Sequence, residues 1–414
     1  MKPNGYGDYI SIQAAINVSN HGDIIELYNG VFKGEENRNL STQGKSIIIQ
    51  SLSGIPDSCI IDCEGDYGKF ERRAFDLSSG EDSTTIIRNI SIINGSTMHY
   101  CPGCEGAAIR LNSASPLLEN IIFKNNHGSH SIIRAEYADN LVIRNCIFTN
   151  NKSFICPGIS LSNFCDNTLI QKSLFIKNSA EQNGSIIRLW KYTNVIGCTF
   201  ADNNLTNDAK SSIFGWGGSI STNEIIIKNV IIANNTINQV VYSYDSNNVI
   251  PDFYYCNIVN NTGENWGGLI EDQHGQSGNI SVSPLFADTL NNNYYLSYGS
   301  PCIDAGDPNS PHDPDGTNSD IGCFYYNQLS AIKPFTDKSD LIIFPNPSSN
   351  NIFIKTYETD WQFITIYNLN GIPLLKREMK PDLLEINVSS LPSGIYIVSI
   401  TSNNKTINNK LIIK

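Results

Sequence analysis

Three arginines recur at the same place in a repeated apolar pattern. Arg110, Arg134 and Arg188 each follow an isoleucine. If that isoleucine points into a core, the period-two alternation of a β-strand turns the arginine outward. The same rule applied to neighbouring repeats gives two outward columns. The first reads Asp76, Arg110, Arg134, Ser160, Arg188, Phe214, Tyr242 and Glu271. The second reads Ser78, Asn112, Glu136, Ser162, Trp190, Trp216, Tyr244 and Gln273. This face is predicted to carry a basic half that runs into an aromatic half.

Such a face suits an acidic polysaccharide. Arginine forks pair with carboxylates, and aromatic rings stack on flat apolar ligand faces. Neighbouring strands repeat at about 4.8 Å, which is comparable to one unit of an extended sugar chain. The predicted ligand-binding residues are Arg110, Arg134, Arg188, Trp190, Phe214, Trp216, Tyr242 and Tyr244. The alternative is a face that is only decorated, with a loop packed over the aromatic residues.

Catalysis by this face is a second hypothesis. β-Elimination needs a base beside a neutralised carboxylate, and Arg134 next to Glu136 could serve. Glycoside hydrolysis needs two carboxylates, for which Glu136 could pair with Asp76 or Glu105. No lyase or hydrolase signature surrounds these residues in the sequence. The sequence therefore leaves a polysaccharide lyase, a glycoside hydrolase and a non-catalytic binding protein open, with Arg134 and Glu136 as the catalytic candidates.

Two groups of residues could bind metal. Five aspartates crowd into one Gly/Pro/Asn-rich segment, and hard oxygen ligands at alternate positions suit calcium. They are Asp304, Asp307, Asp313, Asp315 and Asp320. The alternative is a solvated turn in which Asp and Gly set the backbone geometry. The second group could bind zinc, although disulfide or free thiol states are the alternatives. It comprises His99, Cys101, Cys104, His127 and His130.

The elements that must position these residues are short, repeated strands. Seven runs rich in Ile, Val and Phe align at positions 89, 120, 145, 173, 197, 229 and 255, which by subtraction lie 31, 25, 28, 24, 32 and 26 residues apart. A period in this range indicates a solenoid whose units bury their apolar faces only by stacking. The Asn that closes most runs tolerates the left-handed backbone of a sharp corner, and stacked Asn side chains can hydrogen-bond.

Over residues 8–326 this pattern resembles the right-handed parallel β-helix family, the pectate-lyase-like superfold. The resemblance implies an all-β solenoid, but the fold also hosts hydrolases, esterases, epimerases and adhesins. We expect a helical cap at 1–23, the β-helix to 326 and a closing segment at 277–326. A linker at 327–340 and a small antiparallel β-sandwich at 341–414 follow.

Four separated motifs in the tail carry a second resemblance. They are Phe344-Pro345-Asn346-Pro347, Tyr367-Asn368-Leu369-Asn370-Gly371, Leu391-Pro392-Ser393-Gly394 and the terminal Lys410-Leu411-Ile412-Ile413-Lys414. Together they resemble the type A C-terminal sorting domain of the type IX secretion system. The resemblance implies contact with that machinery and export across a Gram-negative outer membrane. The mature protein would then be anchored at the surface or released.

The composition argues against two classes of partner, nucleic acid and the membrane interior. The 414-residue chain has a formal net charge of −12 and no Lys/Arg block, which argues against nucleic acid. No stretch approaches the roughly 20 apolar residues of a membrane span. The start lacks an apolar signal core, so we expect a trimmed signal peptide or a misplaced start.

The 11 cysteines suit an exported protein. Cys146, Cys198 and Cys256 share one repeat position and are predicted to be buried free thiols. The other eight form pairs that are near in sequence, Cys59/Cys63, Cys101/Cys104, Cys156/Cys165 and Cys302/Cys323, whose connectivity the sequence leaves open.

Two functions follow as hypotheses. The first is an exported protein that binds, or also processes, an acidic polysaccharide. The second is a non-catalytic adhesin or structural surface protein that uses the solenoid as a stalk. The columns of arginine and aromatic residues separate them, because a stalk does not need such a face.

Overall fold

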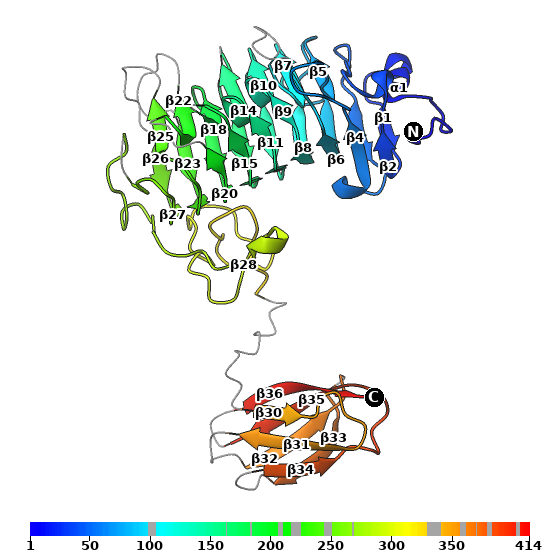
Figure 1. Ribbon diagram of the computed structural model, residues 1–414, viewed down its shortest axis with the longest axis vertical. Coiled ribbons are helices and arrows are strands. Elements are labelled where there is room, and N and C mark those ends of the chain that lie inside the picture. Colours follow the sequence, from blue (N-terminus) through cyan, green and yellow to red (C-terminus); the bar gives the residue numbers. More distant parts are fainter. Residues whose placement is uncertain are drawn as a thin grey trace. The chain divides into compact units, whose positions relative to one another are not determined.

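The computed structural model divides the chain into two compact units, residues 1–329 and 330–414. It describes residues 1–97, 105–162, 164–182, 184–205, 210–216, 225–243, 251–266, 269–328, 341–356, 362–369, 371–378, 383–402 and 406–414. The first unit is a parallel β-solenoid, and the second is a small antiparallel domain (Figure 1). The two units are described separately below.

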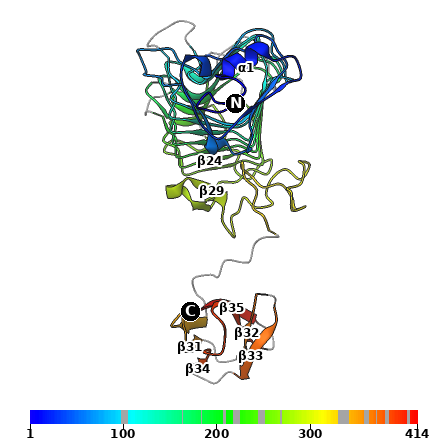
Figure 2. The same ribbon diagram turned by 90° about the vertical axis from the view of Figure 1, so that its right-hand side faces the viewer.

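The solenoid is built from coils that each add one strand to every face. Seven parallel strands form the first face, the seven-stranded sheet. They are β5 (Phe75–Leu77), β7 (Ile109–Asn112), β10 (Ser131–Glu136), β14 (Cys156–Ser162), β18 (Ser185–Leu189), β22 (Ser212–Trp216) and β25 (Gln239–Ser243). Viewed from its N-terminal end, the solenoid shows its strands as superposed coils (Figure 2).

A 16-stranded sheet bends at a corner and supplies the other two faces. Its first arm holds β1 (Ile24–Leu27), β3 (Ile48–Ser51), the first halves of β6 (Ile86–Ile93) and β8 (Leu117–Lys124), β11 (Val142–Arg144), β15 (Leu169–Gln171), β19 (Asn194–Ile196), β23 (Ile226–Lys228) and β26 (Asp252–Tyr254). Its second arm holds β2 (Gly30–Phe32), β4 (Cys59–Asp62), the second halves of β6 and β8, β12 (Ile147–Thr149), β16 (Leu174–Ile176), β20 (Thr199–Ala201), β24 (Ile231–Ala233) and β27 (Asn257–Val259). A four-stranded parallel sheet follows the second arm, with β9 (His127–Gly128), β13 (Lys152–Ser153), β17 (Ser179–Ala180) and β21 (Asn204–Leu205).

Left-handed residues form the corners. The Asn residues that close the runs are left-handed as predicted at Asn94, Asn125, Asn150, Asn234 and Asn260, whereas in the fourth run Lys177 and not Asn178 is left-handed. The corner between the two arms has a left-handed residue in each coil, including Asn89, Asn120 and Asn145. The fourth coil differs from the predicted alignment, because Lys172 rather than Ser173 takes this position.

A second corner ends the second arm and is followed by a buried ladder of Asn126, Asn151, Asn178, Asn203, Asn235 and Asn261. Each amide Nδ2 donates to the Oδ1 of the next coil at 2.8–3.0 Å. This ladder satisfies buried amides and holds neighbouring coils in register.

The interior is filled by stacked side chains. Phe123, Phe148, Phe175 and Phe200 stack along the axis with ring centroids 4.5–4.7 Å apart. All four are fully buried. Phenylalanine stacks of this kind repeat with the strand spacing, so each coil extends one continuous apolar core.

Each end of the solenoid is covered. At the N-terminal end, α1 (Ile12–Val18) buries Ile12, Ala15 and Ile16 over the first coil. The helix begins at Ile12, because the side chain of Ser11 accepts the capping hydrogen bond from the Ala14 N–H. At the other end, the ring of Trp266 packs edge-on against Phe253 and its Nε1 donates to Ser281 at 2.9 Å.

The closing segment covers part of the second arm. It carries the antiparallel pair β28 (Phe286–Asp288) and β29 (Asn293–Leu296). Tyr294, Leu296 and Ile321 pack with outward residues of β16, β20, β24 and β27, such as Leu174 and Ile231. The Tyr294 hydroxyl also donates to Asp202. This segment therefore buries an apolar outer face of the solenoid. The first unit also has three 3-10 turns: η1 (Glu35–Asn37) and η2 (Pro56–Ser58) in loops of the first coils, and η3 (Thr289–Asn291) in the closing segment.

The second unit is the predicted β-sandwich. One antiparallel sheet has β30 (Leu341–Phe344), β31 (Asn351–Thr356) and β34 (Leu383–Asn387). The other has β33 (Pro373–Glu378), β32 (Phe363–Tyr367), β35 (Gly394–Thr401) and β36 (Thr406–Ile413). Ile352 and Ile354 of the first sheet share one core with Ile364 and Val398 of the second.

Candidate functional site

The three predicted arginines lie on one face. Across the seven-stranded sheet, Asp76 pairs in register with Arg110, Arg110 with Arg134, Arg134 with Ser160, and Ser160 with Arg188. We call these five residues the arginine ladder. Because the isoleucines beside the arginines are fully buried, the alternation of the strand turns the ladder away from the core.

Arg134 is the centre of a buried network. Its Nη2 donates to Glu136 at 2.6 Å, its Nη1 donates to Ser160 Oγ at 2.8 Å, and its Nε forms an ion pair with Glu105. Only 9% of Arg134 is exposed, because Glu105 and Gly106 lie against it. Burial raises the pKa of Glu105, and Glu136 adds to this effect, while Arg134 opposes it. Arg134 therefore orients two carboxylates and is covered, whereas the sequence predicted an open guanidinium.

His130 adds a neutral imidazole beside the ladder. Its Nε2 lies 3.1 Å from Nη1 of Arg188. Burial, together with the positive charges of Arg134 and Arg188, lowers the pKa of His130 to about 3. Because an arginine can only donate, Nε2 is the acceptor and the proton sits on Nδ1. That buried Nδ1 has no hydrogen-bond partner in the described part of the chain.

The first coils of the ladder hold a second ion-pair network. Asp76 accepts from Nε of Arg110 and from Nη1 of Arg73, each at 3.0 Å. Arg73 is also paired with Glu71. About one third of the Arg110 side chain is exposed (35%). Arg110 is thus more accessible to a ligand than Arg134.

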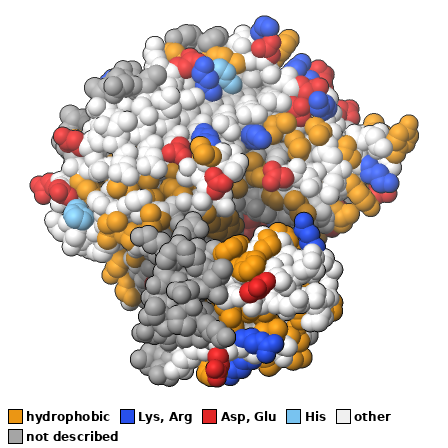
Figure 3. Space-filling view, turned by 60° about the horizontal axis from the view of Figure 1, so that its bottom comes forward, with side chains coloured by type: hydrophobic (Ala, Val, Ile, Leu, Met, Phe, Trp, Pro, Cys, Tyr) orange, Lys and Arg blue, Asp and Glu red, His pale blue; other side chains and the backbone are white. Residues whose placement is uncertain are grey.

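The charges on this face balance. Among the described residues, its ion-pair networks contain four arginines and four carboxylates, namely Arg73, Arg110, Arg134, Arg188, Glu71, Asp76, Glu105 and Glu136. The predicted basic half is therefore neutral, although the whole chain carries −12. The side of the molecule drawn in Figure 3 carries Lys and Arg side chains scattered among Asp and Glu side chains.

The aromatic half differs from the prediction at Phe214. Phe214 pairs in register with the buried Ile187, and it is itself fully buried. Gly215 takes the outward position between Arg188 and Tyr242. The predicted outward position of Phe214 is therefore wrong. This coil has two consecutive apolar residues, Ile213 and Phe214, and the second of them points inward. Ile133 and Ile187 are likewise the second apolar residues of their coils and point inward.

The other predicted aromatic residues have varied positions. Tyr242 lies in the outward column and is half-buried. Trp190 is also half-buried and packs against the core. The backbone of Trp216 pairs with Leu189, so it does not share the column of Glu136. Tyr244 lies outside the described residues.

Three exposed aromatic residues beside the ladder were missed. Tyr137, Phe164 and Tyr192 follow β10, β14 and β18 and are 51%, 63% and 43% exposed. All three have left-handed backbone, with φ of 52°, 59° and 51°, which bulky residues rarely adopt. The rings of Tyr137 and Phe164 stack with centroids 5.8 Å apart. Their spacing of 27 and 28 residues, by subtraction, matches the repeat and could have identified them.

The five predicted calcium ligands lie in the closing segment. Four of their carboxylates accept backbone hydrogen bonds, and that of Asp304 accepts from the side-chain amide of Gln328 at 2.6 Å. Asp320 accepts from the N–H groups of Asp304 and Tyr326, and Asp313 accepts from that of Asp320. Asp315 accepts from Gln328, and Asp307 pairs with Lys228 at 2.9 Å. Within the described residues, no three His, Cys, Asp or Glu side chains form a group that could hold a metal ion. Calcium binding here stays a prediction.

The other predicted group is dispersed or undescribed. His99, Cys101 and Cys104 lie outside the described residues. The ring of His127 stacks on Tyr67, while His130 contacts Arg188. The two histidines thus have different partners.

The cysteines of the described residues are all free and buried. Cys146, Cys198 and Cys256 are at most 1% exposed, as predicted, and burial raises the pKa of Cys146 to about 12. Cys156 and Cys165 contact carbonyls near opposite ends of β14, at Ile159 and Ser162, so this pair is not joined.

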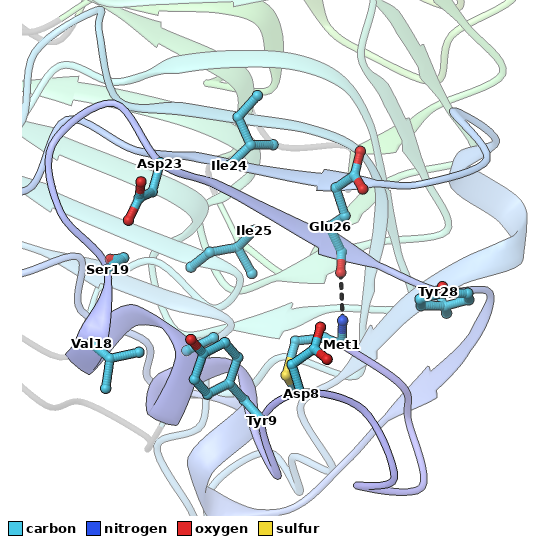
Figure 4. A pocket seen from close by; sticks show the side chains of 11 residues that line it. Met1, Asp8, Tyr9, Val18, Ser19, Asp23, Ile24, Ile25, Glu26 and Tyr28 are labelled. Atoms are coloured by element: carbon cyan, nitrogen blue, oxygen red, sulfur yellow. Dashed lines mark hydrogen bonds between the residues drawn. The ribbon is translucent and has the colours of Figure 1, made fainter.

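A pocket of about 310 Å³ lies at the N-terminal end of the solenoid, away from these residues. Its lining comes from residues 1–28, including Tyr9, Val18 and Ile24 (Figure 4). The amino group of Met1 donates to the Glu26 carbonyl at 2.8 Å. None of the predicted site residues lines this pocket.

Comparisons with known proteins agree with both units. Residues 14–200 match the family model of the right-handed β-helix region, and residues 342–414 match that of the secretion system C-terminal sorting domain. An endo-acting ulvan lyase of Formosa agariphila is 32% identical over 78 residues, which are 18% of this chain and 15% of the lyase. The chain thus covers well under two thirds of that relative.

The sorting domain indicates export to the cell surface or the medium by the type IX system. Among the described residues, no helix is long and apolar enough to span a membrane. This chain is a right-handed parallel β-helix protein that carries a type IX secretion C-terminal sorting domain.

Proposed function

We propose that this exported protein binds an acidic polysaccharide along the arginine ladder. The observation that carries the proposal is the register, which places Arg110, Arg134 and Arg188 on neighbouring or next-neighbouring strands of one sheet. With strands about 4.8 Å apart, an extended glycan that runs along the solenoid axis meets a new group at each coil.

Arg110 and Arg188 are the groups proposed to contact the glycan. Arg110 is partly exposed, and Arg188 ends the ladder, with Trp190 two residues further on and Tyr242 in the same column two strands away. Arg134 is the positioning residue, because its guanidinium fixes Glu105 and Glu136. The exposed rings of Tyr137, Phe164 and Tyr192 supply apolar contact at the edge of the same sheet.

Electrostatics favour an acidic glycan at this face over other parts of the surface. The eight charged groups of the ladder networks cancel, whereas the rest of the chain carries the net −12. A polyanion therefore meets less repulsion here, and a local patch can oppose the net sign of a protein. The short match to a polysaccharide lyase supports a polysaccharide as the partner class.

Cleavage of the bound glycan is the second candidate function. Glu105 and Glu136 flank Arg134, and the pKa of Glu105 is raised by burial. Glu105 and Glu136 supply the two carboxyl groups that glycosidic bond cleavage requires. Under this candidate, Glu136→Gln abolishes product formation while polysaccharide binding remains.

Affinity electrophoresis of the full chain in gels with polygalacturonate tests the proposal. Arg110→Ala and Arg188→Ala should each weaken retention by roughly five- to tenfold, because each loses a charge-assisted contact. Arg144→Ala is the matched control, since Arg144 is similarly exposed (42%) and paired with Glu119 at 2.7 Å, but it lies on the first arm. Equal retention of all three variants and wild type would contradict the proposal and favour a stalk or adhesin.

A further inference from the structure

The second arm carries a pocket that is separate from the arginine ladder. It has a volume of about 540 Å³ and lies between the outer face of β8, β12 and β16 and the closing segment. A volume of this size is typical of small-molecule sites. The covered part of the same arm is sealed by Tyr294 and Leu296, so the pocket begins where that covering ends.

The floor of the pocket is apolar and regular. Ile122, Ile147 and Leu174 pair in register on three neighbouring strands and line it. Their side chains follow one another at the strand spacing of about 4.8 Å. This gives a flat apolar strip in which Ile147 is half-buried, while Ile122 and Leu174 are only 9% and 3% exposed, so Ile147 offers the contact for the apolar face of a sugar ring.

Polar side chains line both edges of this strip. Asn120, Asn145 and Lys172 lie along the corner before the strands, and Lys124 and Thr149 lie at the strand ends. Amide and hydroxyl groups at these edges can hydrogen-bond sugar hydroxyls. The apolar strip thus suits the apolar face of a sugar ring, and its polar edges suit the hydroxyl groups of the sugar.

The two lysines make the lining of the pocket positively charged. Neither Lys124 nor Lys172 makes an ion pair within the described residues. One carboxylate, that of Asp57, also lines the pocket, so two positive charges face one negative charge. An anionic group is the ligand feature that would neutralise this excess.

The closing segment supplies an aromatic wall. Tyr295 and Phe324 line the pocket, and their rings stack with centroids 4.2 Å apart. Tyr295 remains 52% exposed. An exposed aromatic ring beside lysines and amides is a typical contact for a sugar ring that carries a carboxylate.

We propose that this lysine pocket is a second glycan site, which binds a short saccharide bearing carboxylates. It is independent of the arginine ladder, because the two sites lie on different sheets and share no residue. A protein with both sites holds an acidic glycan at two faces of one solenoid, and occupation of both raises the avidity for a long polymer.

Lysine footprinting of the full chain with trigalacturonate tests this proposal. Acetylation of Lys124 and Lys172, measured by mass spectrometry, should fall at least about fivefold when the ligand saturates the pocket. Lys152 is the internal control, because it lies on the four-stranded sheet and is paired with Glu181. Fully methyl-esterified trigalacturonate, which has the same shape without charge, should give no protection at the same concentration.

Variants separate this site from the proposed function. Lys124→Ala combined with Lys172→Ala should weaken trigalacturonate binding roughly tenfold or more in calorimetry, since two charge-assisted contacts are lost. Arg110→Ala should leave the protection of both lysines unchanged. Absence of protection, protection by the methyl ester, or loss of protection in Arg110→Ala would each overturn the lysine pocket as an independent site. Protection that appears without ligand as protein concentration rises would also overturn it, by assigning this face to a second copy of the chain.

Discussion

The seven-stranded sheet and the second arm present two outer faces of opposite chemistry on one solenoid. The first carries paired charges, with Arg134 held between Glu105 and Glu136. The second carries Leu174, Ile176 and Ile231, which the closing segment buries. The backbone of both faces is the same parallel ladder, so the outward side chains decide whether a face is covered by its own chain or left for a partner.

The difference also shows what each face contributes to stability. Apolar burial stabilises in proportion to the area removed from water, at about 25 cal/mol per Å². Ion pairs on a face contribute little when exposed, but a buried charge becomes costly once its partner is removed. The loss in the free energy of unfolding caused by a mutation should therefore depend on which face the mutation changes, and the losses can be ranked.

The largest effect is expected on the covered face. Tyr294→Ala removes a side chain that is 2% exposed and leaves Asp202 without its phenolic donor. We expect a loss of about 3–4 kcal/mol in the free energy of unfolding. Urea unfolding followed by circular dichroism measures it. Limited proteolysis should also cut faster within residues 284–326, and unchanged cleavage there would contradict the covering role.

The next effect is expected at the centre of the arginine ladder. Arg134→Met leaves two carboxylates without their cation and should cost about 3 kcal/mol. The triple variant Arg134→Met, Glu105→Gln and Glu136→Gln removes the unpaired charges and should recover most of that loss. The same urea titrations compare the two variants. A triple variant that is no more stable than Arg134→Met would contradict the buried network.

A smaller effect is expected on how the free energy of unfolding depends on pH, through His130. Its pKa is about 3 in the folded state against 6.5 when unperturbed, so the folded protein binds fewer protons than the unfolded chain between these values. Stability is therefore lost as pH falls through this window. Between pH 7 and pH 4.5, wild type should lose about 2 kcal/mol more than His130→Gln. Urea unfolding at both pH values checks this, and equal losses would contradict a neutral His130.

The smallest effect is expected from Arg110. Its pair with Asp76 is partly exposed, so Arg110→Ala should change stability by less than about 1 kcal/mol. The control Arg144→Ala should give a similar small change, because its pair with Glu119 is also exposed. A loss above about 2 kcal/mol for Arg110→Ala would place Arg110 in the structural network and remove it as a ligand contact.

The sequence was sufficient to predict the repeat and most of its alignment. Short apolar runs closed by Asn specify strands and left-handed corners locally, and Asn94 and Asn125 adopt the predicted backbone. The register of Arg110, Arg134 and Arg188 followed from period-two alternation alone. Each of these features depends on residues close in sequence.

Features that depend on loops were harder to predict. Ile213 and Phe214 are both fully buried, so polarity alone does not say which one occupies the inward column. The burial of Arg134 arises from Glu105, which reaches it from a preceding loop. The closing segment seals one arm through contacts about 100 residues apart, such as that between Tyr294 and Asp202. The alternation of apolar and polar residues within a strand does not show which outward residues a distant loop will cover.

The most direct test of the ladder as a glycan site is the affinity for oligogalacturonides of increasing length. Arg110 to Arg188 spans four neighbouring strands, β7, β10, β14 and β18, or roughly 14 Å. Calorimetry of wild type should show an affinity that rises up to about four sugar units and then levels off. Arg110→Ala should level off at a shorter length. An affinity that does not depend on length, or a dependence that Arg110→Ala leaves unchanged, would contradict a glycan lying along the ladder.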